Sequence, residues 1–392
     1  MKRRILIFSL AYYPRFVSGA EVAIKEITDR IDPDDIEFHM ITLLFDRAEP
    51  REEQIGNVRV HRISFAGGYL SKMLYIPFAA LKARSLNAAW HFDAFWSVMT
   101  YMLFPVVLAR VLGVRVPHAL SLQDGDPYEK VFDRWFVYPC TPILDVGFRT
   151  AGAVQTISTY LATWPPKRGY TGTVEVIPNG ASLASAQEYP EEELEALKRE
   201  IGKKEGEILL ISVSRLVYQK GIDTIIRALP LLEPRIRLLI VGDGADKDML
   251  VTLAHELAVD DRIVFTGQVD RTMTAKYRKI SDVFVSPSRS EGQGISFVST
   301  MISGLPMIAT QEGGLADFIF DAKRNPEKPT TGWAVDKDSP EQIAEAVGEI
   351  LAHPEQAKKV VATAKQYAHD HFDWDAIARR MREEVFEKVL TR

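Results

Sequence analysis

The sequence has almost no cysteine and no long apolar run, and both absences restrict the class of protein to which it can belong. Cys140 is the single cysteine among 392 residues, so an intramolecular disulfide is excluded and a reducing compartment is expected. The most apolar stretch, 97–109, contains Pro105 and is shorter than the roughly 20 residues that cross a bilayer. Ile5–Phe8 is short for a signal peptide and runs into Tyr12-Tyr13-Pro14, which favours a buried first strand. We therefore expect a soluble protein of the cytoplasm.

A strong excess of one charge is also missing. The net charge is −5, and no charged tail or low-complexity stretch is present, so nucleic acid is not an expected partner. The hydrophobic content of 46% and the charged content of 26% are ordinary for a globular protein. A single core stops growing at roughly 250–300 residues, so this length predicts two domains.

Short apolar runs alternate with helical patterns along the chain, which is typical of parallel α/β sheets. In the first half the runs are 5–8, 38–44, 58–63, 94–98, 118–122, 153–157 and 174–177. After Pro178-Asn179-Gly180 and an acidic segment, the alternation starts again at 208–213, 237–241, 263–266, 283–286, 307–309 and 332–335. Several runs are apolar on both alternate faces, as in strands that helices cover on both sides. The pattern predicts two doubly wound domains, 1–180 and 181–371, with a cleft between them.

The ends of the predicted strands are where a ligand is expected, because ligands bind beyond the carboxyl ends of strands in open α/β sheets. After the run 208–213, a loop carries Arg215 and Lys220 and ends at Gly221. The planar fork of arginine and the point charge of lysine suit a diphosphate. A solvated surface loop is the alternative, and spacing alone does not separate the two.

Three further strand ends carry glycine. Gly242-Asp243-Gly244 permits a sharp turn or a close approach to a ligand, although many α/β proteins have such a turn for packing. Glu291-Gly292-Gln293-Gly294 precedes a predicted helix at 295–301, whose free N–H groups suit a phosphate. Glu291 suits sugar hydroxyls or a cationic transition state, with a helix-capping acid as the alternative. In the first half, Phe16–Glu21 carries Gly19 before a helix, which is a weak signal by itself.

Together, in this order and spacing, these elements resemble the family 4 glycosyltransferases of the GT-B fold, over almost the whole chain. The likeness is carried by the Arg-x4-Lys-Gly loop, the Gly-Asp-Gly turn and the Glu-Gly-x-Gly loop, and also by Pro178-Asn179-Gly180, Gly313-Gly314 and Thr331-Gly332. The resemblance implies an α/β protein with two facing Rossmann-like domains and an inter-domain cleft. Phe372-Asp373-Trp374 looks like the start of the family's closing helix, so 372–392 is expected to return to the first domain.

The resemblance also implies an activity: a retaining transferase that moves a sugar from a nucleotide sugar to a glycan or lipid-linked acceptor, with no metal or other cofactor. In it, Arg215 and Lys220 neutralise the donor's diphosphate and Glu291 contacts the transferred sugar, so the main catalytic task is to stabilise the leaving group. The leaving phosphate helps to deprotonate the acceptor, and no nucleophile is needed. The expected donor-binding residues are Gly19, Gln123, Asp124, Gly242, Gly244, Val269, Glu291, Gly292, Gly294, Ile295 and Ser299.

Two positions depart from the family pattern. Where the family has a second glutamate, eight residues after the first, this chain has Ser299. Losing a charged hydrogen bond costs about 1.5–3 kcal/mol, so donor binding is expected to weaken or to use another ribose contact. Gln123 stands where family members carry a histidine that touches the sugar, and glutamine carries no charge near neutral pH. His118 lies five residues earlier and is expected to be a packing or surface residue.

Other functions stay open at this point. A partner subunit that kept the fold but lost efficient transfer is consistent with Ser299. A nucleotide-sugar epimerase would need acid/base groups, for which Glu291, Asp124 and Asp126 are the candidates. Peripheral contact with the inner face of a membrane is a further alternative, because 64–78 interleaves aromatic and apolar residues ahead of Lys82 and Arg84. An ordinary loop and a buried helix explain that segment equally well.

Overall fold

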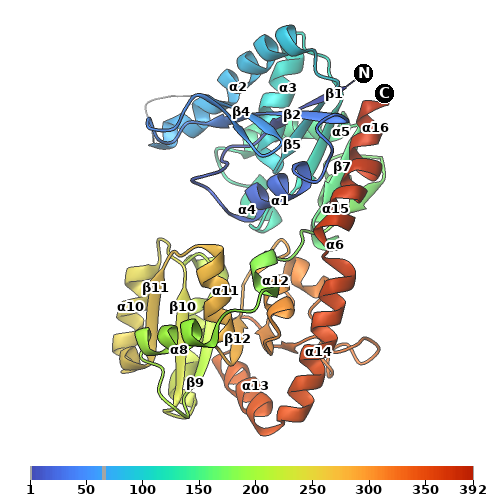
Figure 1. Ribbon diagram of the computed structural model, residues 1–392. Helices are drawn as coiled ribbons and strands as arrows, with labels where there is room; N and C mark the ends of the chain where they lie inside the picture. The colour runs from blue at the N-terminus through green and yellow to red at the C-terminus, as the bar shows by residue number, and fades with distance from the viewer. Residues whose placement is uncertain (1, 64–67, 392) are drawn as a thin grey trace. The chain divides into compact units, whose positions relative to one another are not determined.

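The computed structural model describes residues 2–63 and 68–391, which divide into two compact units. The first unit is Met1–Asn179 with Trp374–Arg392, and the second is Gly180–Asp373. Each unit is built on a largely parallel sheet with helices packed against it (Figure 1). The predicted fold class, an α/β chain with two Rossmann-like sheets, is therefore confirmed. Among the described residues, no helix combines the length and the apolar character needed to cross a bilayer.

The sheet of the first unit has the strand order β3-β4-β2-β1-β5-β6-β7-β8. Neighbouring strands are parallel except for β3 and β4. The bounds are β1 Arg3–Phe8, β2 Ile36–Leu43, β3 Glu52–Ile55, β4 Val58–Ile63, β5 Ala94–Val98, β6 His118–Leu122, β7 Ala153–Thr156 and β8 Val174–Val176. The apolar runs predicted all of these strands except β3, which is a polar strand at the exposed edge.

Helices pack on the first sheet because each carries an apolar stripe. In α1, Ile24 and Ile27 are buried, as their helical spacing predicted. The Glu21 carboxylate accepts a hydrogen bond from the Ser18 N–H at 3.0 Å and so caps the helix start. Helices α2 and α3 pack on a cluster that includes Leu6, Phe8 and Phe95. The helices that precede the second unit are α1 Gly19–Thr28, α2 Gly68–Trp90, α3 Leu103–Val111, α4 Tyr128–Phe132, α5 Thr141–Arg149, α6 Thr159–Ala162 and α7 Trp164–Lys167.

The C-terminal segment belongs to the first unit. It consists of α15 Trp374–Arg380, a π-helical stretch Met381–Phe386 and α16 Glu387–Leu390, which Figure 1 shows in red beside the first sheet. The Phe386 ring lies 4.9 Å from Trp96 and 5.8 Å from Phe38, measured between ring centroids.

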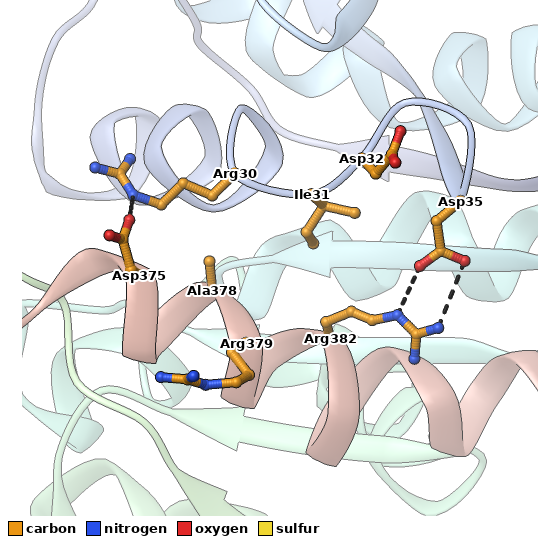
Figure 2. Close-up of a pocket in the computed structure, with 8 residues that line it drawn as sticks. All are labelled: Arg30, Ile31, Asp32, Asp35, Asp375, Ala378, Arg379 and Arg382. Atoms are coloured by element: carbon orange, nitrogen blue, oxygen red, sulfur yellow. Dashed lines mark hydrogen bonds and ion pairs between the residues drawn. The ribbon is translucent and has the colours of Figure 1, made fainter.

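A pocket of about 290 Å³ lies between the segment 30–35, which follows α1, and the C-terminal segment. Figure 2 shows two ion pairs across it, Arg30 with Asp375 and Arg382 with Asp35, both at 2.7 Å. None of the predicted site residues is among the residues that line this pocket, so it reflects how the terminal helix is attached to the first unit.

The second sheet is entirely parallel, in the order β11-β10-β9-β12-β13-β14. The bounds are β9 Ile208–Val213, β10 Ile236–Val241, β11 Ile263–Gly267, β12 Val283–Ser286, β13 Met307–Ala309 and β14 Trp333–Ala334. Alternate residues of β9 and β10 enter different cores. One core contains Leu210 and Leu238, and the other contains Leu209 and Leu239. The strands are thus buried on both faces, as the continuous apolar runs predicted.

Helices cover both faces of the second sheet. Helices α9, α10 and α13 contribute to the core that contains Leu210, and α8, α11 and α12 contribute to the core that contains Leu209. Helix α14 contributes to both cores. Their bounds are α8 Glu191–Glu200, α9 Ile222–Ala228, α10 Lys247–Glu256, α11 Arg271–Lys279, α12 Ile295–Ser303, α13 Pro340–Ala352 and α14 Pro354–His371.

Candidate functional site

The strand order of the second sheet reverses between β9 and β12. These strands are neighbours, with β10 and β11 on one side and β13 and β14 on the other. At such a point the following helices diverge to opposite faces, and ligands of open α/β sheets bind beyond the strand ends there. The loop after β9 (214–221) and the loop after β12 (287–294) both begin at this switch point. The topology therefore brings the predicted diphosphate loop and the predicted sugar loop together.

Contacts between the two loops confirm that they are adjacent. The Lys220 ammonium forms an ion pair with the Glu291 carboxylate, although the two residues are 71 positions apart. Their side chains are only 14% and 11% exposed. Gly221 has a positive φ of 64°, and a Cβ built on it would lie 2.3 Å from the Pro287 carbonyl oxygen. Glycine is needed there because the backbones of the two loops touch.

Arg215 differs from Lys220 in its surroundings. It is exposed, and among the residues that the structure describes no carboxylate pairs with it. The backbone around it is fixed: Ser214 donates its N–H to the Val241 carbonyl at 3.1 Å, and Leu216 donates to the Asp243 carbonyl at 3.0 Å. The site thus offers one exposed cation on an ordered loop and one cation that is already paired.

Gly242 and Gly244 were expected to let a ligand approach closely, but the chain's own backbone occupies the space beside them. A Cβ at Gly242 would lie 1.9 Å from the Ser214 carbonyl oxygen, and one at Gly244 would lie 2.2 Å from that of Leu216. Gly242 also has a φ of 139°, where side chains are strained. Both glycines therefore shape the loop that presents Arg215, and direct donor contact by them stays a prediction.

The other predicted residues of this loop lie at the start of α12. Gly292 is buried, Gly294 is the N-cap with a φ of 92°, and Ile295 is the first helical residue. Glycine has no side chain with which to cap the first turn, so the first N–H groups of α12 are left without an acceptor from the cap residue, directly after the loop that follows β12. Val269 follows β11, and its partly buried side chain packs against the core that contains Leu209.

Ser299 is buried and engaged. It is 2% exposed, and its Oγ accepts a hydrogen bond from the Ser182 N–H at 3.1 Å. The segment after the predicted domain boundary is thereby tied to α12. Nearby, the buried Arg278 guanidinium donates to the Ser296 Oγ at 2.9 Å and holds the first turn of the same helix. Burial lowers the pKa of Arg278 to about 10.

Sequence reasoning missed Arg289, which lies on the loop that carries Glu291 and contacts the loop that carries Lys220. Its guanidinium donates to both carboxylate oxygens of Asp223, at 2.9 and 2.7 Å, and pairs with Asp338 at 2.6 Å. It also donates to the Tyr218 carbonyl at 2.7 Å and lies 4.2 Å from the centroid of the Tyr218 ring. Its position two residues before Glu291 was the one available signal, because its partners come from distant parts of the chain.

In the first unit, Gln123 follows β6 and pairs with Asn179. The Asn179 amide donates to the Gln123 Oε1 at 2.8 Å, and the Gln123 amide donates to the Asn179 Oδ1 at 3.3 Å. Gly19 is exposed at the start of α1, after β1. The order of the first sheet reverses between β1 and β5, so Gly19 also follows a switch-point strand.

Asp124 is buried beside the loop after β5. Its carboxylate accepts hydrogen bonds from the Thr100 Oγ1 at 2.9 Å and from the Thr100 N–H at 3.2 Å. Burial raises the pKa of Asp124 to about 6, because desolvation outweighs those two hydrogen bonds. His118 is fully buried, and its Nε2 lies 3.0 Å from the Gly147 carbonyl, which confirms it as a packing residue.

Two family models match the chain. A model described as "Glycosyl transferase 4-like domain" matches residues 18–180, and one described as "Glycosyl transferases group 1" matches residues 194–367. The first range contains Gly19, Gln123 and Asp124, and the second contains Arg215, Lys220 and Glu291. Between them the two ranges contain every strand of both sheets except β1.

Curated relatives point the same way. The chain is 28% identical over 256 residues to a GDP-mannose-dependent alpha-(1-6)-phosphatidylinositol monomannoside mannosyltransferase of Mycobacterium tuberculosis, covering 61% of this chain and 64% of that protein. It therefore matches less than two thirds of that relative's length. It is 27% identical over 331 residues to the alpha-monoglucosyldiacylglycerol synthase of Streptococcus pneumoniae, covering 81% of this chain and 73% of that one.

Solved structures with the same fold cover nearly the whole chain. Sucrose-phosphate synthase from Thermosynechococcus elongatus has a TM-score of 0.82 at 20% identity and covers 98% of both chains. Anabaena HepE, solved in complex with UDP and glucose, has a TM-score of 0.78 at 18% identity and covers 97% of this chain and 99% of that one. These structural similarities show that the chain has the GT-B fold. The matches to both family models, together with the curated relatives, show that it belongs to the family 4 glycosyltransferases.

Proposed function

We propose that the chain is a retaining glycosyltransferase that moves a sugar from a nucleotide-sugar donor to a lipid or glycan acceptor without a metal. The observation that carries this proposal is the meeting of Arg215, Lys220 and Glu291 on two loops at one switch point. The names of the relatives support it, since one is called GDP-mannose-dependent and a structural neighbour was solved with UDP and glucose.

The charges of the site suit a diphosphate leaving group. Arg215 offers an exposed fork of donors and Lys220 a point charge. Lys220 pairs with Glu291. When a phosphate oxygen of the donor replaces Glu291 as the partner of the Lys220 ammonium, the Glu291 carboxylate becomes free to interact with the sugar. Positive charge develops at the anomeric carbon in the transition state, so a carboxylate freed there stabilises it.

In the proposed reaction, the bond between the anomeric carbon and the diphosphate oxygen breaks. The acceptor oxygen bonds to the same carbon on the same face, and the acceptor's proton passes to the leaving phosphate oxygen. The diphosphate carries two negative charges in the donor and gains a third as the bond breaks, until the acceptor's proton neutralises one. Arg215 and Lys220 stabilise this charge, a task that a divalent cation performs at other sites that bind phosphate oxygens.

Donor cleavage tests this proposal. The protein is incubated with UDP- and GDP-sugars in the presence of EDTA, and released nucleotide and the anomeric configuration of the product are followed by NMR. We expect slow release with retention, and its loss in Arg215→Ala/Lys220→Ala. The control is Lys323→Ala/Arg324→Ala, which removes a lysine and an arginine from another loop of the same unit. These two residues pair with Glu349 and Asp336, and the control variant should keep the activity. An inverted product or an absolute need for metal contradicts the proposal.

A partner subunit that binds nucleotide without transfer is the second candidate. It is favoured by Ser299, whose hydroxyl is already held by the Ser182 N–H and is a weaker ribose ligand than a glutamate. Nucleotide binding without any donor cleavage would support this candidate. The structure gives no support to the epimerase alternative, because its candidate base Asp124 is buried and accepts a hydrogen bond from Thr100.

For the acceptor, we propose a lipid reached by peripheral contact of the first unit with a membrane. Residues 64–67 of the segment singled out for this role lie outside the described residues, and Tyr75 is buried. Helix α2, however, exposes Met73 and Leu81, 54% and 50% accessible, beside the exposed Arg84. Such a mixed apolar and basic face suits an anionic lipid surface.

Three further exposed side chains, close together in the sequence, support an acceptor with an apolar part. They are Trp135, 85% accessible, Tyr138, 66% accessible, and Ile143, 43% accessible. Aromatic side chains with one apolar and one polar end favour lipid–water interfaces. We expect flotation with anionic liposomes, reduced in Met73→Glu/Leu81→Glu and in Trp135→Ala/Tyr138→Ala. Flotation that neither variant changes would place the lipid contact elsewhere, and no flotation would favour a glycan acceptor.

A further inference from the structure

We propose that Arg289 is a positioning residue of the donor site, which rests on the proposed function. It acts through Lys220, by clamping the loop that carries this lysine against the loop that carries Glu291. The contacts of its side chain and of its backbone both support this role.

The side chain of Arg289 joins three segments. One is the first turn of α9, through two hydrogen bonds to Asp223. Another is the loop between β14 and α13, through Asp338. The third is the Lys220 loop itself, through the Tyr218 carbonyl and ring. The Arg289 side chain is 10% exposed, so all of these contacts are made by one largely enclosed guanidinium.

The backbone of Arg289 fixes the same loop from a second point. Its N–H donates to the Gln219 carbonyl at 2.7 Å. Together with the close approach of Gly221 to Pro287, this leaves little freedom for the residues on either side of Lys220. The ion pair between Lys220 and Glu291 then follows from the fixed spacing of the two loops.

The chemistry of arginine explains why this residue type is needed. A planar guanidinium can bind a carboxylate through two parallel hydrogen bonds, reach a carbonyl and stack on an aromatic ring at once. A lysine has no fork and no planar face, so it cannot keep these contacts together. Asp338 has a φ of 60°, a strained conformation for a residue with a side chain, and its pairing with Arg289 offsets that strain.

A rival explanation is that Arg289 only stabilises the second unit. The two explanations differ in how its substitution combines with that of Lys220. If Arg289 acts through Lys220, then once Lys220 is gone the loss of Arg289 has no further effect on diphosphate affinity. If it only stabilises the fold, the melting temperature falls and diphosphate affinity does not change.

The experiment is a double-mutant cycle on the full chain, with UDP and GDP as probes in calorimetry. We expect Arg289→Ala to raise Kd about tenfold, since a displaced Lys220 loses most of a charge-assisted hydrogen bond. Arg289→Lys should do nearly the same. Lys220→Ala should raise Kd at least as much, and the double variant should bind no more weakly than Lys220→Ala alone. The matched control Arg324→Ala removes an arginine that pairs with Asp336 and should leave Kd unchanged.

Effects of Arg289→Ala and Lys220→Ala that multiply would overturn the proposal, as would an unchanged Kd with a lowered melting temperature. Tyr218→Ala removes only the stacked ring, which is 68% exposed, so this variant is expected to fold and to raise Kd more modestly. Hydrogen exchange without nucleotide gives an independent readout: amides of 215–221 should exchange faster in Arg289→Ala, and those of α10 should not. If the wild type binds neither nucleotide, the proposed function fails. The exchange result then still shows whether Arg289 holds the loop 215–221 in place.

Discussion

Replacing Glu291 by glutamine should tighten the binding of a nucleoside diphosphate while it abolishes most sugar transfer. The reason is the ion pair between Glu291 and Lys220, in which a carboxylate occupies the cation that a phosphate needs. The variant keeps the shape of the side chain and removes its charge. Lys220 is then available to the diphosphate, and the repulsion between two anions at one site disappears.

The magnitude follows from the burial of the pair. At an effective dielectric constant of about 20, opposite charges about 4 Å apart attract by roughly 4 kcal/mol. Most of this is lost to desolvation and to the competing diphosphate, and a charge-assisted hydrogen bond contributes about 1.5–3 kcal/mol net. Taking the lower value, we expect Kd to fall about tenfold. Transfer should fall about 100-fold or more, because a charged group that stabilises the transition state is gone.

Calorimetry with UDP, GDP and ADP at about 0.15 M salt measures the affinity. The control Glu312→Gln makes the same charge change in the same unit, at a carboxylate that lies 3.6 Å from Lys337, and should alter Kd little. An unchanged or higher Kd in Glu291→Gln would refute the reasoning, because it would show that the ion pair does not compete with the ligand.

Three further predictions test other contacts. Gly242→Ala should lower the free energy of unfolding by about 3 kcal/mol, because its Cβ meets the Ser214 carbonyl and its φ is strained; Gly267→Ala, with a φ of 72° and no close neighbour, should cost less in urea denaturation. For Asp124, the folded-state pKa near 6 exceeds the ordinary value of 3.8, so its contribution to stability is present below pH 4 and lost as the pH rises through 6. The unfolding free energy of Asp124→Asn relative to the wild type should therefore rise by about 2.5 kcal/mol between pH 4 and pH 7, and a difference that stays constant with pH would contradict the burial argument. Ser299→Ala leaves the Ser182 N–H without its acceptor and should cost about 1–3 kcal/mol of stability, measured by thermal unfolding.

The strands could be predicted from the sequence because most are short apolar runs between polar or glycine-bearing segments. Several predicted bounds, such as 58–63, 94–98 and 208–213, are those of the structure. The exception is β3, whose Glu-Glu-Gln-Ile sequence contains no apolar run, since a strand at an exposed edge needs none.

The candidate site could be predicted in part. The residue types of Arg215, Lys220 and Glu291 indicated a diphosphate and a sugar. The sequence did not show that Gly242 and Gly244 serve the chain's own loop, because only the tertiary structure places Ser214 and Leu216 beside them. Nor did it single out Arg289, whose partners Asp223 and Asp338 lie 66 and 49 positions away.

The sequence alone determined the class of the protein: two units of alternating strands and helices, with cations and glycines at strand ends in the order of one family. Local patterns suffice for this, because strand and helix formation depend on apolar periodicity and on turn residues. The order of the strands was decided only by the tertiary structure. That order makes β9 and β12 neighbours, and it brings Glu291 beside Arg215 and Lys220, which lie on a loop about 70 positions earlier in the chain, to form one charged site.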